Sequence, residues 1–141
     1  MGRRSQRLGR QDGLRWDSPT DMPHVTLDIS ANLGDLADGL LDSVIGACQG
    51  SGGFDAAVIM GRAVVHDRFR VLQQGASAFV AATLRIRPGR DDGFVAGLSA
   101  RIAGEIERVL ALRGVRLRTC VTCEIAEIDL RTRALILFGD P

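Results

Sequence analysis

The chain has 141 residues, of which 45% are hydrophobic and 25% charged, and a formal net charge of +1 at pH 7. This composition is typical of one globular domain, and no apolar run approaches the roughly 20 residues that a membrane span needs. All 18 basic residues are arginine, and tyrosine is absent, which excludes a Schiff-base lysine and a tyrosine acid. Proton transfer near neutral pH is therefore left to His24, His66, a perturbed carboxylate or thiol, or the amino terminus.

Residues 1–21 differ in charge from the rest of the chain. They hold five arginines against three aspartates, whereas the remainder holds 13 arginines against 14 acids. Because the first segment has no hydrophobic period, we expect residues 1–21 to be a disordered or artefactual N-terminal arm and residues 22–141 to be the folded domain. An upstream, mistaken or alternative start codon is the favoured origin of this arm, with translation otherwise beginning at Met22, and a basic arm that touches RNA is the alternative. The slightly acidic body disfavours nucleic acid as a partner.

Apolar residues at every second position predict strands, and a period of three to four predicts helices. In the first half we expect a strand at 23–30, a helix from Asn32 as N-cap to the glycines at 50–53, and a strand at 56–65. In the second half we expect a strand at 79–87, a helix capped by Asp91 or Asp92 and closed at 113–114, and a strand at 117–130. The tail to Pro141 is expected to add an edge strand. The glycines at 50–53 match no phosphate-binding loop.

This order of elements is β-α-β followed by β-α-β. Each helix would be a right-handed crossover between parallel strands, and each has a single apolar stripe. The predicted fold class is therefore α+β, built from α/β-type units, with a four-stranded sheet and two helices on one face. The other face of the sheet then needs a cover, which in so short a chain we expect to be another subunit.

The three cysteines are expected to be reduced thiols in a cytoplasmic protein, because their number is odd and no signal peptide precedes them. Cys120 and Cys123 form a CxxC pair within a predicted strand, where a spacing of three places the two thiols on opposite faces. No second Cys or His pair lies nearby to complete a zinc site. Core thiols, with no metal, are therefore predicted.

The chain resembles the 5-carboxymethyl-2-hydroxymuconate isomerases of the tautomerase superfamily. The matching pieces span residues 22 to about 130 in order: Met22-Pro23-His24, Asp28 to Leu33, Ile59-Met60-Gly61-Arg62, and Gly75 with Ala78-Phe79-Val80, Thr83-Leu84, Ile86 and Gly89-Arg90.

The resemblance implies a homotrimer of duplicated β-α-β subunits and a cofactor-free 1,3-proton shift on an unsaturated, dicarboxylate-type acid from aromatic catabolism. It implies that Pro23, as the N-terminal residue, is the catalytic base. A free α-amine titrates near pH 8, whereas a proline nitrogen inside the chain is an amide and not basic. Arg62 is the position best matched to a substrate carboxylate, and Arg70 is a second candidate.

Two positions depart from the family pattern. The family often shows two arginines flanking a serine, but here the sequence is Met60-Gly61-Arg62, so one arginine is missing. Asp28 stands where glutamate is usual. His24 and His66 are interpreted as surface or hydrogen-bonded residues. Arg85 and Arg87 alternate along a strand, and the sequence leaves open whether they serve a subunit interface or a pocket.

The sequence therefore supports two main hypotheses. The first is an isomerase or tautomerase with Pro23 as general base. The second is a catalytically inactive trimeric binding or scaffold protein on the same fold, with a blocked proline. A nucleic-acid-associated module that acts through the arm is a third, disfavoured reading.

Overall fold

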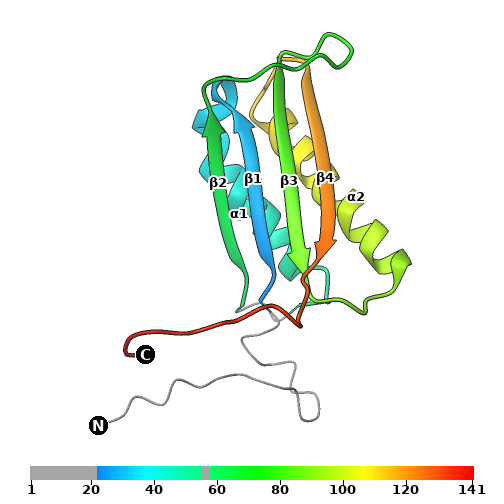
Figure 1. Cartoon of the computed structure of the whole chain (residues 1–141). Coiled ribbons are helices and arrows are strands. Elements are labelled where there is room, and N and C mark those ends of the chain that lie inside the picture. Colours follow the sequence, from blue (N-terminus) through cyan, green and yellow to red (C-terminus); the bar gives the residue numbers. More distant parts are fainter. Residues whose placement is uncertain (1–21, 55–57) are drawn as a thin grey trace.

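The structure is a computed structural model that describes residues 22–54 and 58–141, so the expectations for residues 1–21 lie outside the described residues. The elements are β1 (His24–Ser30), a 3-10 helix (Ala31–Leu36), α1 (Ala37–Gln49), β2 (Met60–His66), β3 (Ala78–Ile86), α2 (Asp92–Leu112) and β4 (Thr119–Glu127). Figure 1 shows both helices on one side of a single sheet, which confirms the predicted layer arrangement.

The four strands follow the order β2-β1-β3-β4. β1 pairs in parallel with β2, β3 pairs in parallel with β4, and the two β-α-β units meet at the antiparallel pair of β1 and β3. α1 and α2 are therefore the crossover connections of the two parallel pairs, as the sequence predicts. Because β1 and β3 are central, their side chains are packed more fully than those of the edge strands.

The hydrophobic core fills the space between the sheet and the helices. From β1 it receives Val25, Leu27 and Ile29, each at most 1% exposed, and burial of each such side chain stabilises the fold by about 1.5–3 kcal/mol. From α2 it receives the side chains of its apolar stripe, Leu98, Ile102, Ile106, Val109 and Leu110. The opposite face of the sheet carries no helix among the described residues, and we call it the open face.

A close approach between β2 and α1 depends on a glycine. A Cβ atom at Gly61 would lie 2.7 Å from Cδ1 of Ile45 and 3.1 Å from Cδ1 of Leu41. The absence of a side chain at Gly61 thus lets the edge strand lie close on the helix, which sets the position of its neighbour Arg62 on the open face.

Of the two predicted helix N-caps, one is wrong and one is confirmed. Asn32 does not cap a helix, because its side-chain amide donates a hydrogen bond of 2.9 Å to the carbonyl of Ser77 in the loop before β3. Asp91 does cap α2 and accepts from the backbone N–H of Phe94 at 3.2 Å. α2 ends at Leu112 with Arg113 as its C-cap, and Gly114 follows with φ of 67°, a conformation that glycine adopts without strain.

The second and fourth strands are shorter than predicted, and no strand occurs in the described residues 128–141. The expected edge strand is replaced by a turn at Asp129–Arg133, after which the tail runs along the lower end of the sheet (Figure 1). Ile136, Leu137 and Phe138 in this tail are 74–87% exposed.

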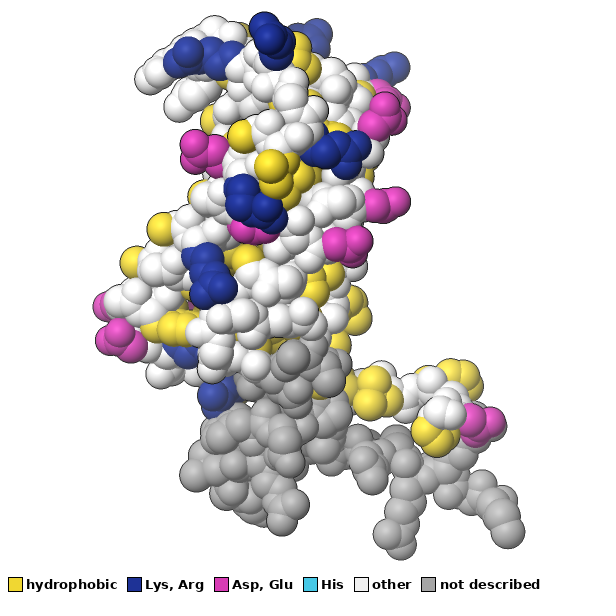
Figure 2. All heavy atoms as spheres, turned by 180° about the vertical axis from the view of Figure 1, so that it is seen from behind, with side chains coloured by type: hydrophobic (Ala, Val, Ile, Leu, Met, Phe, Trp, Pro, Cys, Tyr) yellow, Lys and Arg dark blue, Asp and Glu magenta, His cyan; other side chains and the backbone are white. Residues whose placement is uncertain are grey.

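The helix-covered side has no single region of one charge sign. Figure 2 shows arginine and acidic side chains dispersed over this side of the molecule. No helix among the described residues is long and apolar enough to cross a membrane.

Candidate active site

Pro23 lies at one end of the sheet, immediately before β1. Its side chain is buried, and its carbonyl oxygen accepts a hydrogen bond of 3.0 Å from the N–H of Met60, the first residue of β2. This bond continues the parallel ladder one step beyond β1. The nitrogen of Pro23 is therefore held at a fixed place where β1 enters the sheet.

His24 follows on the open face, between two neighbouring strands. In the register it is opposite Met60 of β2 and Arg85 of β3. Arg62 lies one row further along, opposite Thr26, and also points to the open face because strand side chains alternate. The alternation of β1, β2 and β3 thus places one histidine and two arginines on one surface near Pro23.

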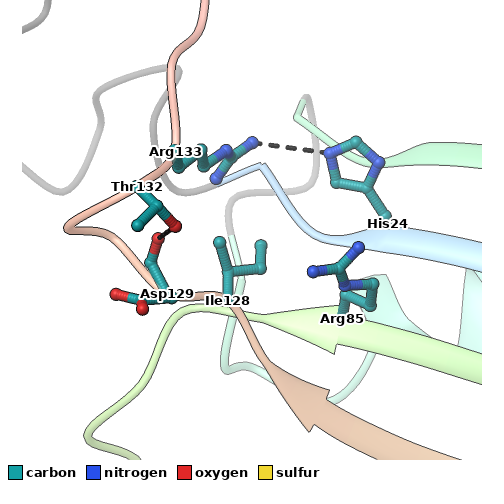
Figure 3. Close-up of a pocket in the computed structure, with 6 residues that line it drawn as sticks. All are labelled: His24, Arg85, Ile128, Asp129, Thr132 and Arg133. Atoms are coloured by element: carbon teal, nitrogen blue, oxygen red, sulfur yellow. Dashed lines mark hydrogen bonds between the residues drawn. The ribbon is translucent and has the colours of Figure 1, made fainter.

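A third arginine comes from the tail. The N–H of Ile128 donates to the carbonyl of Ile86 at 2.7 Å, which anchors the chain after β4. The N–H of Arg133 then donates to the carbonyl of Asp129 at 3.1 Å, and this turn directs Arg133 back toward β1. Its Nη2 lies 3.4 Å from Nε2 of His24, as the dashed line in Figure 3 shows.

Beside His24 lies an open cavity of about 310 Å³, within the usual size range of small-molecule sites. The cavity is lined by His24, Arg85, Ile128, Asp129, Thr132 and Arg133, and we call it the arginine pocket (Figure 3). The only carboxylate of this lining, Asp129, is paired with Arg131, whose Nε and Nη2 donate to its two oxygens at 3.0 Å each. This pairing holds the pKa of Asp129 below its usual range. The lining also contributes two guanidinium groups, those of Arg85 and Arg133.

The protonation of His24 follows from these surroundings. Burial lowers the pKa of His24 below its ordinary value of 6.5, and the charges of Arg133, Arg62 and Arg85 lower it further. The imidazole is therefore neutral at neutral pH. Because a guanidinium is only a donor, Nε2 of His24 accepts from Arg133 and the ring proton is on Nδ1.

The structure brings together two of the three site residues predicted from the sequence. Pro23 and Arg62 lie at the same end of the sheet, and the charge of Arg62 acts on the neighbouring His24. Arg70 lies beyond the other end of β2, where it donates to the carbonyl of Phe69 at 2.7 Å. Since β2 has seven residues at about 3.3 Å each, Arg70 is about 20 Å or more from Pro23 in the same chain.

Sequence reasoning missed Arg133 and left Arg85 unassigned. The alternation of β3 put Arg85 on the open face, but its placement beside His24 depends on the antiparallel register. Nothing in the sequence marks Arg133, since its approach to His24 results from the turn that starts at Asp129.

A second polar group occupies the opposite end of the open face. Nε2 of His66 lies 2.7 Å from Oδ1 of Asp28, and both side chains are just over one-third exposed. The interpretation of His66 as a hydrogen-bonded residue is confirmed. Asp28, the shorter residue in the place of the usual glutamate, thus has a partner on the neighbouring strand.

The cysteines are free thiols in the structure. Cys48 of α1 is buried in the core and Cys123 packs against the core, as predicted, whereas Cys120 is on the open face, so the prediction of a core thiol is wrong for Cys120. The predicted separation of the CxxC pair onto opposite faces of β4 is confirmed. Among residues 22–54 and 58–141, no group of three or more His, Cys, Asp or Glu side chains is placed to hold a metal ion.

The fold places the chain among the tautomerase-fold proteins. A solved 5-carboxymethyl-2-hydroxymuconate isomerase from Deinococcus radiodurans R1 superposes with a TM-score of 0.68 at 21% identity, over 80% of this chain and 87% of that one. A 5-carboxymethyl-2-hydroxymuconate delta-isomerase gives 0.64 at 21% identity, over 84% and 89%. A fused 4-OT symmetric trimer gives 0.55 at 16% identity, over 80% and 94%.

The sequence model of the 5-carboxymethyl-2-hydroxymuconate isomerase family matches residues 23–134. The chain therefore belongs to this family, as the ordered motifs of its sequence predict. No curated protein sequence matches it. The matched range begins at Pro23 and includes both Arg62 and Arg133.

Proposed function

We propose that the protein is a cofactor-free isomerase that catalyses a 1,3-proton shift on an unsaturated carboxylate such as 5-carboxymethyl-2-hydroxymuconate, a step in the breakdown of aromatic compounds. Pro23 is the general base in this proposal, in a mature chain that begins at that residue. The observation that carries the proposal is the coincidence of two positions. The family match begins at Pro23, and Pro23 lies buried next to the arginine-rich end of the open face.

The chemistry of the proline nitrogen supports this role. A free N-terminal nitrogen has a reference pKa of about 8. Pro23 is buried, and Arg62, Arg85 and Arg133, whose charges act on the neighbouring His24, lie at the same end of the sheet. Burial and nearby positive charge each disfavour the protonated form of an amine. An amine that titrates near the working pH is suited to taking a proton from one carbon and returning it to another.

The proton shift needs positive charge near the base. When Pro23 takes the proton from the first carbon, the electron pair of the broken C–H bond passes into the conjugated system as a dienolate. The neighbouring arginines stabilise this anion, and the proline then returns the proton to the far carbon. Arg62 is the proposed ligand of a substrate carboxylate. Arg70 is too distant within one chain, so we propose that it serves the site of a neighbouring subunit.

We further propose that the chain forms a homotrimer through the open face. Met60 and Val64 on this face are 43% and 44% exposed, and the apolar tail residues provide further surface for a second copy. The solved 4-OT relative is itself described as a symmetric trimer. We expect the protein in solution to have three times the mass of its single mature chain.

The first test is the N-terminal residue of the protein from its native host, determined by intact mass. A chain that begins at Pro23 supplies the free amine, and it should ketonise a simple enol such as phenylenolpyruvate. Pro23→Ala should then lower kcat by roughly 100-fold, because a general base contributes about 10² or more. Pro88→Ala, in the loop after β3, is the matched control and should leave kcat unchanged.

The alternative is a catalytically inactive trimeric binding or scaffold protein on this fold. It is favoured if the mature chain retains residues 1–22, since Pro23 then has an amide nitrogen that accepts no proton. A trimer without enol-ketonising activity, and with a retained arm, would replace the isomerase proposal by this one.

A further inference from the structure

A second cavity lies on the helix-covered side of the sheet, where α2 begins beside the turn that ends α1. It has a volume of about 220 Å³ and is lined by Ser51, Gly93, Phe94, Gly97, Leu98 and Arg101. We call it the helix cavity. It shares no lining residue with the arginine pocket, which contains His24 and Arg85 of the open face. The proposed isomerase reaction takes place on the open face and does not use the helix cavity.

One face of α2 forms most of the wall of the helix cavity. Phe94, Gly97, Leu98 and Arg101 are spaced i, i+3, i+4 and i+7, so they lie along one side of the helix. Leu98 is buried, and the Phe94 ring packs edge-on against Phe54 with 6.2 Å between the ring centroids. A Cβ atom at Gly97 would meet no side chain within 4 Å, apart from those of its chain neighbours. The space over Gly97 is therefore left open by the packing.

The loop after α1 forms the opposite wall, and two of its glycines allow close contact with α2. A Cβ atom at Gly53 would overlap the ring of Phe94, and one at Gly50 would lie 2.9 Å from Nη2 of Arg101. Because these side chains are absent, Phe94 and Arg101 lie against the loop at the two ends of the cavity. Ser51 fixes the loop between them. Its hydroxyl donates to a carbonyl in the last turn of α1 at 2.6 Å and accepts from the N–H of Gly53 at 3.3 Å.

Arg101 is the only charged side chain in the lining of the helix cavity. The acid one turn further along α2, Glu105, is paired with Arg108. Among the described residues, Arg101 has no ion-pair partner, and its side chain is exposed. The cavity thus combines one unpaired cation with apolar walls and contains no carboxylate of its own.

We propose that the helix cavity binds a small monocarboxylic acid with an apolar body. The carboxylate pairs with Arg101, and the body lies on the bare backbone of Gly97 against the Phe94 ring. Phe94 and Arg101 are about 10 Å apart along the helix axis, a span suited to an acid such as 3-phenylpropanoate. A second carboxylate at the Phe94 end would lose water without gaining a partner, which disfavours dicarboxylates. This site goes beyond the proposed function, and its test needs no isomerase activity.

The test is an NMR titration of the full ¹⁵N-labelled 141-residue chain with 3-phenylpropanoate. The amide signals of Gly93 and Gly97 report on the helix cavity, and those of His24 and Thr26 report on the open face. The matched probe is 3-phenylpropanamide, which has the same shape and no charge. We expect saturable shifts at Gly93 and Gly97 with a Kd of about 1 mM for the acid. The amide should bind at least tenfold more weakly, because it forms no charge-assisted hydrogen bond with Arg101.

Three variants locate the site. Gly97→Leu fills the open space and suits a helix better than glycine, so it should fold and should abolish the shift of Gly93. Gly104→Leu is the matched control, since Gly104 is on the same helix but outside the lining, and a Cβ atom there also meets nothing within 4 Å. It should bind the acid as the wild type does. Arg101→Gln should weaken binding of the acid at least tenfold and leave that of the amide unchanged. Circular dichroism establishes that each variant is folded.

The outcomes separate this inference from the proposed function. Shifts confined to His24 and Thr26 would overturn the site in the helix cavity and leave the isomerase in place. Equal affinity for the acid and the amide, or unchanged binding in Gly97→Leu, would also overturn it, as would the absence of any shift at about 10 mM acid. Binding that is lost in Gly97→Leu and Arg101→Gln, in a protein without enol-ketonising activity, would support the site and remove the isomerase.

Discussion

The two faces of the sheet are made of alternate residues of the same strands, yet they differ in almost every property. In β1, Val25 and Leu27 are at most 1% exposed, whereas His24, Thr26 and Asp28 on the open face are only half-buried. On the helix face the side chains are buried, and their packing against the helices limits which side-chain volumes fit. The open face carries the polar groups, and its Pro23 end is the candidate site. Separating stability from chemistry in this way lets charged residues gather beside Pro23 without being placed in the core.

The largest expected effect is on stability, and it is measured by shortening two neighbouring side chains of β1. Leu27→Ala should lower the free energy of unfolding by about 2–5 kcal/mol, because it leaves a cavity in a core that the helices close. Thr26→Ala, on the open face, should change it by less than about 1 kcal/mol. Urea unfolding followed by circular dichroism measures both values. Equal losses would show that the two faces are packed to the same extent.

Thiol chemistry gives a second comparison of the faces. Burial raises the pKa of Cys48 to about 11, and burial also raises the pKa of Cys123. Since the thiolate is the nucleophile, both should react slowly with iodoacetamide at pH 8, and Cys120 on the open face should react first. Peptide mapping over time measures the three rates, with urea-unfolded protein as the control in which the rates converge. Labelling of Cys48 as fast as that of Cys120 would contradict a closed helix face.

The smallest expected effect is the pH dependence that His24 gives to stability. Burial and the nearby arginines lower the pKa of His24 in the folded protein, so between pH 6.5 and the folded pKa the unfolded chain binds more protons. Stability from this group is therefore complete above pH 6.5 and falls as the pH is lowered through that range. His24→Gln should lose less stability than the wild type between pH 7.5 and 5. Parallel curves for the two proteins would show that the arginines do not act on His24.

The elements of the fold were largely predictable because the apolar periods are local and strong. The alternation in β1 and the stripe of α2 each follow from residues a few positions apart, and the Asp91 cap follows from a short motif. Asn32 was mispredicted because its amide found a partner 45 residues away, at Ser77, which no local pattern encodes. The edge strand predicted in the tail is absent, because the chain turns at Asp129–Arg133 instead of pairing with the sheet.

The candidate site shows the same division. Pro23 and Arg62 were predicted through motifs in which the residue type itself carries the signal. Arg85 was placed on the correct face but without a partner, because only the antiparallel register puts it beside His24. Arg133 was not predicted at all, since a long tail and a turn at Asp129 bring it 109 residues back along the chain to His24.

By itself, the sequence determined the two β-α-β units, the apolar face of each strand and helix, and the membership of a family whose match begins at Pro23. These features depend on the periods of strands and helices, which any short stretch of chain contains. Only the tertiary structure decided which charges surround Pro23. That choice depends on the pairing of β1 with β3 and on the course of the tail, and both are contacts between residues far apart in the chain.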